Sequence, residues 1–338
     1  MPANVSPEYK KAEAAYRRAR DPGERLDLLR EMMRTIPKHK GTEHLQADIK
    51  SRIKELGDQL AGPSKAGART GPQTAIRPEG AAQVVLLGPP NTGKSAMHAA
   101  LTGSHAQVAP HPFTTQWPLP GMLGVDDVSL QLIDLPPITD THEFPWIANA
   151  MQQADGALLV IDLGHAGCVE ELVVLHDVLA ARKVHLIAAW PSGTPTASTI
   201  DDDPFAISLP TVIVANFADE IAAVDEQLAV LRELTGYAYP TLTASAAAGE
   251  GLEEIGHWLF RQLGIVRVYT KIPHEPPDMG RPYTVRSGET VLDVARLVHR
   301  DFAESLQFAR LWGGGDFEGQ QVGAEHVVAD GDIIELHA

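Results

Sequence analysis

The first 60 residues repeat apolar and polar positions with the period of an α-helix. Apolar side chains recur every three or four residues from Leu26 to Ile36, and again from Leu45 to Leu60. This spacing places them along one face of an amphipathic helix. Proline and glycine interrupt the pattern between these stretches. The segment is therefore predicted to form three helices, over residues 7–20, 23–36 and 43–60.

Residues 81–264 follow a different pattern, in which short apolar runs alternate with segments of helical spacing. Several runs are apolar almost throughout, as in a parallel sheet that helices cover on both faces. Residues 61–80, rich in Gly, Pro and Ala, are predicted to form a linker. Residues 190–210, which include three consecutive aspartates, are predicted to form a long exposed loop. The predicted strands are Gln83–Leu87, Ser129–Asp134, Gly156–Asp162, His185–Ala189 and Thr211–Ala215.

Residues 265–338 return to strand-like runs around one helical stretch. Strands are predicted at 266–272 and near 283–286, a helix at 291–299, and short strands after it. The order ββαββ is typical of a small α+β domain. The chain is thus divided into a helical segment (1–60), a linker (61–80), an α/β domain (81–264) and a C-terminal domain (265–338).

Charge is unevenly distributed over these parts. The chain of 338 residues has a formal net charge of −16, which is unlike a general nucleic-acid-binding protein. The first 60 residues, however, hold 13 Lys and Arg against 10 Asp and Glu, whereas residues 81–264 hold 5 against 21. The acidic average therefore permits RNA contact through the N-terminal helices, while DNA is not an expected partner.

The cysteine content and the length of the apolar runs limit the cross-links, metal sites and cell compartments that we expect. A single cysteine, Cys168, cannot form an internal disulfide or a zinc site made of several cysteines. No run of 18 apolar residues is present, and the N-terminus lacks the apolar core of a signal peptide. We therefore expect a cytoplasmic protein without a membrane span.

The strongest motif is a glycine-rich segment between an apolar strand and a helical stretch. Residues 88–95 read GPPNTGKS and fit the phosphate-loop pattern G-x-x-x-x-G-K-[ST]. Backbone N–H groups of such a loop bind phosphate, Lys94 would neutralise the β- and γ-phosphates, and Ser95 would bind Mg²⁺. A glycine-rich turn without a ligand is the alternative. The expected nucleotide-binding residues are Gly88, Pro89, Pro90, Asn91, Thr92, Gly93, Lys94, Ser95 and Ala96.

This loop resembles that of the Obg/DRG-type translation-factor GTPases, which reads G-x-P-N-x-G-K-S. The segment Pro112–Thr115 resembles the switch I element of the same family, although Phe-Thr-Thr taken alone is typical of an ordinary strand. The resemblance implies that Thr115, with Thr114 as second choice, closes on Mg²⁺ and the γ-phosphate. It also implies a K⁺ ion at Asn91; the alternative is that Asn91 only caps the loop.

The residues after the next apolar strand depart from the family pattern. Asp134 would hold the Mg²⁺ shell through water. The family pattern D-x-P-G has Pro137 in place of its glycine here. Proline has no N–H to donate to a γ-phosphate, so we expect weakened sensing of that phosphate. Ile138 stands where many small GTPases carry a water-positioning glutamine, but an apolar residue there is usual in the resembled family.

The base-recognition element would be Asn216–Asp219, which resembles the N-K-x-D motif. The Asp219 carboxylate can accept two N–H bonds from guanine, whereas adenine would leave it unpaired. Phe217 replaces the lysine of the motif, so we expect lower affinity with guanine preference kept. Ser245 and Ala246 resemble the element that backs the base. Outside the phosphate loop, the expected nucleotide-binding residues are Asp134, Asn216, Phe217, Asp219, Ser245 and Ala246.

The C-terminal region resembles the TGS domain that follows the GTPase domain in developmentally regulated GTP-binding proteins. The resemblance implies a ubiquitin-like β-grasp fold and contact with RNA or the ribosome. Trp312 and Tyr283 are equally compatible with a place in the core and with such a contact. The matching segments include Arg267–Lys271, Arg281–Tyr283, Ala309–Trp312 and Asp330–Asp332.

The segment Lys40–Leu45 resembles the helical part that precedes the GTPase domain in the same family. Basic side chains gather on the first predicted helix. They are interpreted as a solvated face, which we favour, or as a contact for ribosomal RNA phosphates. These side chains are Lys10, Lys11, Arg17, Arg18 and Arg20.

Together these features indicate an α/β P-loop NTPase domain between an N-terminal α-helical segment and a C-terminal TGS domain. The expected function is a Mg²⁺-dependent GTP- and GDP-binding protein and slow GTPase, a switch associated with translation or the ribosome. The alternative, favoured by Pro137 and Phe217, is a nucleotide-binding scaffold with little hydrolysis whose TGS domain and basic helices bind RNA or protein. Asp219 argues against a third alternative, an ATPase. The expected catalytic residues are Lys94, Thr115 and Asn91, and the expected metal ligands are Ser95, Thr115 and Asp134.

Overall fold

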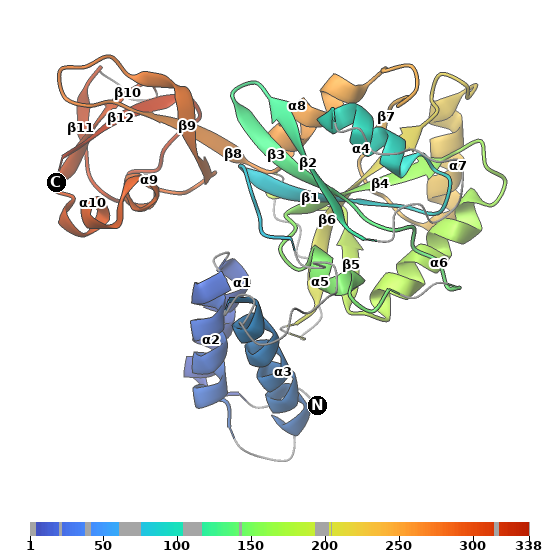
Figure 1. Cartoon of the computed structure of the whole chain (residues 1–338), viewed down its shortest axis with the longest axis horizontal. Coiled ribbons are helices and arrows are strands. Elements are labelled where there is room, and N and C mark those ends of the chain that lie inside the picture. The colour runs from blue at the N-terminus through green and yellow to red at the C-terminus, as the bar shows by residue number, and fades with distance from the viewer. Residues whose placement is uncertain are drawn as a thin grey trace, which may run out of the picture. The chain divides into compact units, whose positions relative to one another are not determined.

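A computed structural model describes most of the chain (Figure 1). The described residues are 5–19, 22–37, 42–60, 76–103, 117–141, 144–192, 203, 205–313 and 318–337. They divide into two compact units. The first comprises residues 1–72 with 199–206, and the second comprises residues 73–198 with 207–338.

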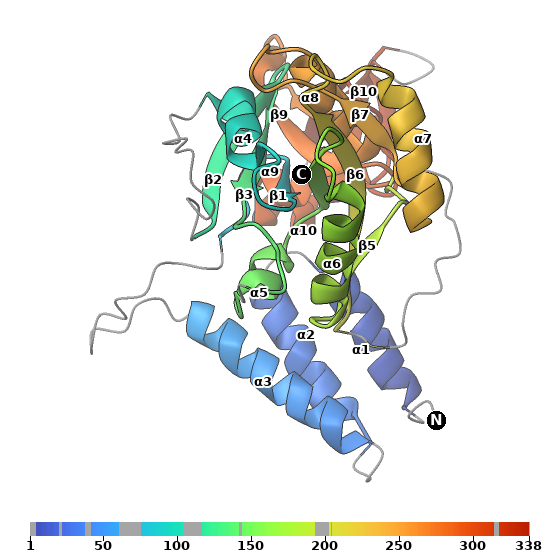
Figure 2. The ribbon, with the colours of Figure 1, turned by 90° about the vertical axis from the view of Figure 1, so that its right-hand side faces the viewer.

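The first unit contains the three predicted helices, which the structure confirms. They are α1 (Pro7–Arg18), α2 (Pro22–Thr35) and α3 (Glu43–Leu60). Figure 2 shows the three helices together, and α2 packs against both α1 and α3. The hydroxyl of Ser6 caps α1 by accepting from the Tyr9 N–H at 3.1 Å, and donates to the Thr35 carbonyl oxygen at 3.0 Å. The helical period thus builds a small core of its own, which includes Tyr9, Leu29, Met32 and Ile49.

Phe205 belongs to this small core as well. Its side chain is 4% exposed, its ring lies edge-on to Tyr16 at 6.3 Å, and the Arg52 guanidinium lies 4.6 Å above it. The prediction that residues 190–210 form one exposed loop is therefore wrong at this residue. The reason is a packing contact between segments far apart in the sequence, which the local composition does not reveal.

The second unit contains a seven-stranded sheet formed by described residues, with the path β2-β3-β1-β4-β6-β5 and with β7 paired to β6. The pairs are parallel except for the hairpin of β2 and β3. The strands are β1 (Ala82–Leu87), β2 (Leu119–Val125), β3 (Val128–Asp134), β4 (Gly156–Asp162), β5 (Val184–Ile187), β6 (Ile207–Asn216) and β7 (Thr241–Thr243).

Helices cover both faces of this sheet, which confirms the predicted α/β fold. One core layer includes Leu172 and Leu175 of α6, and the opposite layer includes Met97 of α4 and Leu259 of α8. The helices are α4 (Lys94–Thr102), α5 (Ile147–Met151), α6 (Cys168–Ala180), α7 (Val224–Thr235) and α8 (Leu252–Gln262).

Strand β2 is not among the predicted strands; its sequence LPGMLGV carries one proline and two glycines, which weaken the strand pattern at a sheet edge. The prediction of one exposed loop over residues 190–210 is wrong at two further places. Residues 207–210 continue β6 and pair with β5, although they were assigned to the exposed loop. Trp190, the first residue of that predicted loop, is 6% exposed and donates from Nε1 to the Thr211 carbonyl oxygen at 3.2 Å.

The C-terminal residues form a second sheet, with the order β11-β10-β12-β8-β9 among described residues. Parallel pairing of β12 with β8 and the helix α9 between the two halves give the expected β-grasp arrangement. A capping box of Thr290 and Asp293 starts α9. The short helix α10 was not predicted. The elements are β8 (Ile265–Thr270), β9 (Asp278–Arg286), α9 (Val291–Val298), α10 (Arg300–Ser305), β10 (Phe308–Trp312), β11 (Gln320–Val322) and β12 (Asp332–His337).

Candidate functional site

The phosphate loop has a backbone that only glycine fits at two positions. Gly88 has φ +153°, and a Cβ added to it would lie 2.3 Å from the Val160 carbonyl oxygen. Gly93 has φ +81°, and a Cβ there would lie 2.2 Å from Nδ2 of Asn216. At these two positions the loop backbone passes so close to its neighbours that a side chain would not fit. This close approach explains both glycines of the motif.

Asn216 connects three of the predicted nucleotide-binding segments. Its Nδ2 donates to the Thr92 carbonyl oxygen at 3.0 Å, and its Oδ1 accepts from the Ala246 N–H at 3.0 Å. The side chain is fully buried at the end of β6. It therefore fixes the phosphate loop and the Ser245–Ala246 segment relative to the base-recognition element, as the sequence motifs require.

The base-recognition turn leaves its carboxylate accessible. Asp219 is exposed, while the turn before it is held by the Ala218 N–H, which donates to the Ala244 carbonyl oxygen at 3.1 Å. Phe217 adopts φ +59° and is half-buried, with its ring edge beside Gly93. Ser245 is buried, and its hydroxyl accepts from the Ala248 N–H at 3.0 Å. Ser245 thus shapes its own turn.

A hydroxyl and a carboxylate meet where the metal is expected. Ser95 Oγ donates to Asp134 Oδ2 at 2.6 Å, although the two residues come from α4 and the end of β3. Asp134 is fully buried. Hydroxyl and carboxylate oxygens are the hard ligands that Mg²⁺ prefers, so these two side chains fit a Mg²⁺ ion.

Lys94 is a buried cation at the first position of α4. Its side chain is 6% exposed, and its Cδ lies close to Gly88. Burial lowers the pKa of its ammonium group, an effect that the Asp134 carboxylate partly opposes. A cation that is poorly solvated beside the N-terminus of a helix has a strong electrostatic reason to bind an anion.

The segment after Asp134 attaches to the start of the phosphate loop. Pro137 is buried, and the N–H of the next residue, Ile138, donates to the Gly88 carbonyl oxygen at 3.3 Å. The Ile138 side chain, 3% exposed, belongs to the core layer that contains α6. It is therefore directed into the core, in agreement with the expectation that this position does not activate water.

Other predicted residues lie outside the described part of the chain. These are Pro112, Phe113, Thr114 and Thr115 of the predicted switch I, Arg20 and the side chain of Arg18 of the first predicted helix, Lys40, most of the linker, and residues 193–202 and 204 of the predicted loop. Asn91 is described: it is exposed and adopts φ +62°.

The structure adds a small cavity that the sequence did not suggest. The cavity, of about 100 Å³, lies between Pro89–Thr92 and the residues that join β4 to α6. His165 Nε2 lies 3.4 Å from Glu171 Oε1 on its wall. Burial raises the pKa of Cys168 to about 11, so its thiol stays protonated at neutral pH. No sequence motif marks His165, Cys168 and Glu171, because they reach the phosphate loop only through the parallel pairing of β1 with β4.

Comparisons with known proteins agree with this site. A family described as 50S ribosome-binding GTPase matches residues 83–189, and the TGS domain family matches residues 266–338. A GTP-binding protein of Methanocaldococcus jannaschii is 24% identical over 93% of this chain and 92% of that protein. Developmentally-regulated G-protein 2 of Arabidopsis thaliana is 24% identical over 93% of this chain and 90% of that protein. Among solved structures, a GTP-binding protein of Sulfolobus solfataricus in complex with GDP covers 77% of this chain and 68% of that chain, with 14% identity and a TM-score of 0.39.

The fold, the site and the two family matches define a GTP-binding protein with a P-loop GTPase domain followed by a TGS domain. Over 93% of its length, and at 24% identity, the chain is similar to Obg/DRG-type GTPases such as GTP-binding protein 1 of Schizosaccharomyces pombe and the developmentally regulated G-proteins. Both family matches lie within the predicted domains 81–264 and 265–338, whose outer boundaries stay predictions. Among the described residues, no helix is both long and apolar enough to cross a membrane.

Proposed function

We propose that this chain is a Mg²⁺-dependent switch that hydrolyses GTP slowly in the cytoplasm and acts on the translation machinery. The observation that carries the proposal is the bridge made by Asn216 between the phosphate loop and the Ser245–Ala246 segment. Because both bonds are buried and fully satisfied, they hold the two segments rigidly beside each other. The network supports one continuous site for phosphate and base.

Different described residues bind the phosphates and the base of the nucleotide. The N–H groups of the loop and the start of α4 bind the phosphates, and Lys94 neutralises them. Asp219, exposed at the end of β6, accepts two N–H bonds from guanine. The Phe217 ring stacks on the purine, and the Ala246 backbone lines the other side.

Ser95 and Asp134 would hold the Mg²⁺ ion, together with Thr115. A bound Mg²⁺ would neutralise charge that develops on the β- and γ-phosphates. The 2.6 Å contact between Ser95 Oγ and Asp134 Oδ2 supports this assignment, because it brings the two oxygens to one place. Asn91, exposed at the bend of the loop, offers an amide oxygen to a K⁺ ion.

Slow GTP hydrolysis is expected because the residues after Asp134 lack a backbone N–H for the γ-phosphate and a side chain that activates water. Pro137 has no N–H for a γ-phosphate, and Ile138 is buried in the core. No residue among those described is placed to activate water. The alternative function, a nucleotide-binding scaffold with little or no hydrolysis, is favoured by Pro137 and by Phe217, which replaces the lysine of the base-recognition motif.

One experiment separates the two functions. GTP and Mg²⁺ are mixed with excess protein, and single-turnover hydrolysis is followed in KCl and in NaCl. The switch predicts turnover that K⁺ stimulates and that Lys94→Ala abolishes. GTP binding without turnover in either salt would instead establish the scaffold. Asn91→Ala should remove the difference between the salts and leave GDP affinity nearly unchanged.

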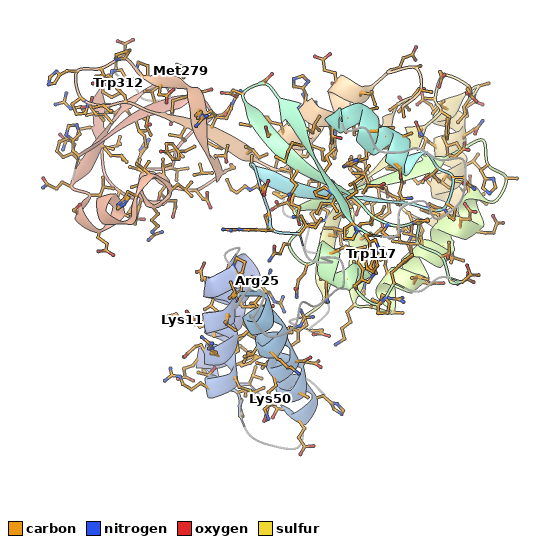
Figure 3. The ribbon with its side chains drawn as sticks, in the orientation of Figure 1. Lys11, Arg25, Lys50, Trp117, Met279 and Trp312 are labelled. Carbon is orange, nitrogen blue, oxygen red and sulfur yellow. The ribbon has the colours of Figure 1, made fainter. Side chains whose placement is uncertain are left out.

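The partner is proposed to be ribosomal RNA, contacted by the TGS sheet and the N-terminal helices. Ala309 and Leu311 of β10 are buried against the TGS core, so Arg310 and Trp312 lie on the opposite face of that sheet. Figure 3 shows Trp312 on this domain and Lys11, Arg25 and Lys50 on the helices. Aromatic and basic side chains together suit nucleic-acid bases and phosphates.

The N-terminal helices support this partner less strongly than the TGS face. Arg17, Arg30 and Arg34 form ion pairs within their own helices, at 2.6 to 2.9 Å. This pairing agrees with the solvated face favoured from the sequence. Binding to ribosomes should therefore weaken more with Arg310→Ala than with Arg30→Ala, as measured by co-sedimentation at increasing salt concentration.

A further inference from the structure

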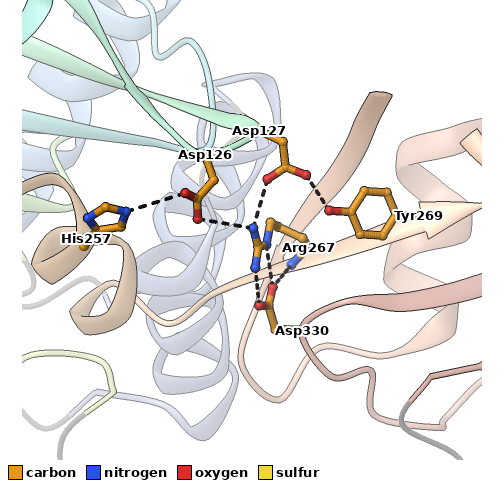
Figure 4. Close-up of polar contacts among 6 residues, drawn as sticks. All are labelled: Asp126, Asp127, His257, Arg267, Tyr269 and Asp330. Carbon is orange, nitrogen blue, oxygen red and sulfur yellow. Dashed lines mark hydrogen bonds and ion pairs between the residues drawn. The ribbon is translucent and has the colours of Figure 1, made fainter. Parts of the chain in front are cut away.

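Arg267 of β8 lies among carboxylates that come from two domains (Figure 4). Its Nη1 contacts Asp127 Oδ1 at 3.0 Å and Asp126 Oδ2 at 3.5 Å. Its Nε and Nη2 donate to the two oxygens of Asp330 at 3.0 and 2.8 Å. Asp126 and Asp127 form the turn between β2 and β3 of the GTPase domain, whereas Asp330 precedes β12 of the TGS domain. The planar guanidinium thus joins the domains through several charge-assisted bonds.

Neighbouring side chains hold this cluster in place. The Tyr269 hydroxyl, two residues further along β8, donates to Asp127 Oδ2. The guanidinium of Arg267 lies 5.0 Å from the ring centre of Phe260 in α8, a cation–π distance. His257 of the same helix lies 3.5 Å from Asp126. The side chain of Arg267 is 21% exposed, so water screens these contacts incompletely.

Arg286 of β9 makes a second contact between the same domains. Its Nη2 lies 3.2 Å from Asp155 Oδ1 and donates to the Ala81 carbonyl oxygen at 3.1 Å. Asp155 in turn accepts from the Gln83 N–H at 2.9 Å, and its own N–H donates to the Gln83 carbonyl oxygen at 2.7 Å. The TGS domain is therefore attached to β1 near its start as well as to the β2–β3 turn.

Both contacts reach strands that end at the nucleotide site. Strand β3 runs from the turn at Asp127 to Asp134, and it is paired along its length with β2 and with β1. Strand β1 runs from Ala82 into the phosphate loop. Hydrogen-bonded strands transmit displacement and stiffness along their length better than loops do.

We propose that Arg267 and Arg286 couple the TGS domain to the nucleotide site, so that a nucleotide at the phosphate loop stabilises the TGS domain. This coupling rests on the proposed function, because it requires nucleotide binding. It is reciprocal: a partner that binds the TGS domain changes nucleotide affinity by the same factor as nucleotide changes partner affinity. Both arginines act as positioning residues and touch no nucleotide.

Hydrogen exchange of the full chain tests the coupling. Amide exchange is measured with and without GDP and Mg²⁺ in the unmodified protein, in Arg267→Met, and in Arg281→Met as a control. Arg281 lies in β9 of the same TGS sheet but is exposed and outside both the contact and the proposed RNA-binding face. In the unmodified protein and the control, GDP should slow exchange in β8 and β12 at least about tenfold. In Arg267→Met, GDP should slow exchange in α4 but no longer in β8 or β12.

The outcomes separate this proposal from the proposed function. If the unmodified protein binds no GDP, the proposed function fails and the coupling fails with it. If GDP slows exchange in α4 but leaves the TGS domain unchanged, only the coupling is refuted. A TGS response in Arg267→Met equal to that of Arg281→Met also refutes it. Asp127→Asn, which leaves every TGS side chain intact, repeats the test if Arg267→Met folds poorly.

Discussion

Replacement of Asn216 by alanine tests whether the site is built as described. The side chain is fully buried and makes two hydrogen bonds, to the Thr92 carbonyl oxygen and from the Ala246 N–H. Each bond contributes about 1 kcal/mol net, and a buried partner left unsatisfied costs about 1–3 kcal/mol. Asn216→Ala should therefore destabilise the GTPase domain by about 2–4 kcal/mol.

The assay uses the distribution of tryptophans. Four of the five tryptophans lie in the GTPase domain, and the fifth, Trp312, lies in the TGS domain. Urea unfolding followed by fluorescence in a Trp312→Phe background therefore reports on the GTPase domain. Asp219→Asn is the matched control, because that side chain is exposed at the same turn. It should change stability by less than about 0.5 kcal/mol.

Nucleotide binding distinguishes the two variants further. Asn216→Ala should weaken the binding of both GDP and ADP, because it loosens the loop that holds the phosphates. Asp219→Asn should weaken the binding of GDP but not of ADP, because it removes an acceptor that only guanine uses. The reasoning is refuted if Asn216→Ala costs less than about 1 kcal/mol, or if Asp219→Asn destabilises the domain equally.

Three further perturbations have defined outcomes. Gly93→Ala should destabilise the GTPase domain by about 1–3 kcal/mol in urea unfolding, because its Cβ would meet Asn216; Gly236→Ala, with a similar φ but open space, should cost less. Lys94→Met removes a buried charge, so it should raise the unfolding temperature without nucleotide by about 2–4 °C and abolish the further rise with GDP. Burial raises the pKa values of Asp127 and Asp330, but hydrogen bonds outweigh it and hold both below 3.8. Because these pKa values are lower in the folded state, the stabilisation by the contact is present above the ordinary aspartate range and is lost as the pH falls through the folded-state values; the protection of β8 amides, taken relative to the intrinsic exchange rate at each pH, should fall accordingly.

The sequence predicted those features that are formed by residues close together in the chain. The phosphate loop is one unbroken segment between a buried strand and a helix, so its pattern sufficed. The three N-terminal helices were found because their apolar period is regular. Strand β2 was missed because its pairing with β3 compensates for a proline and two glycines that argue against a strand.

The contacts that decide function were harder to foresee, because they join distant residues. Asn216 and Thr92 are 124 positions apart, so only the family motif suggested that they meet. Arg267 is 140 positions from Asp127, and in the sequence each looks like an ordinary surface charge. The burial of Phe205 likewise depends on helices that precede it by more than a hundred residues.

The central claim is that this site binds guanine nucleotides through the phosphate loop and Asp219. Equilibrium titration of the full chain with fluorescently labelled GDP and ADP, both with Mg²⁺, tests it most directly. The account predicts that GDP binds at least about 100-fold more tightly than ADP, and that Lys94→Ala loses both. Equal affinity for the two nucleotides, or undiminished GDP binding by Lys94→Ala, would contradict it.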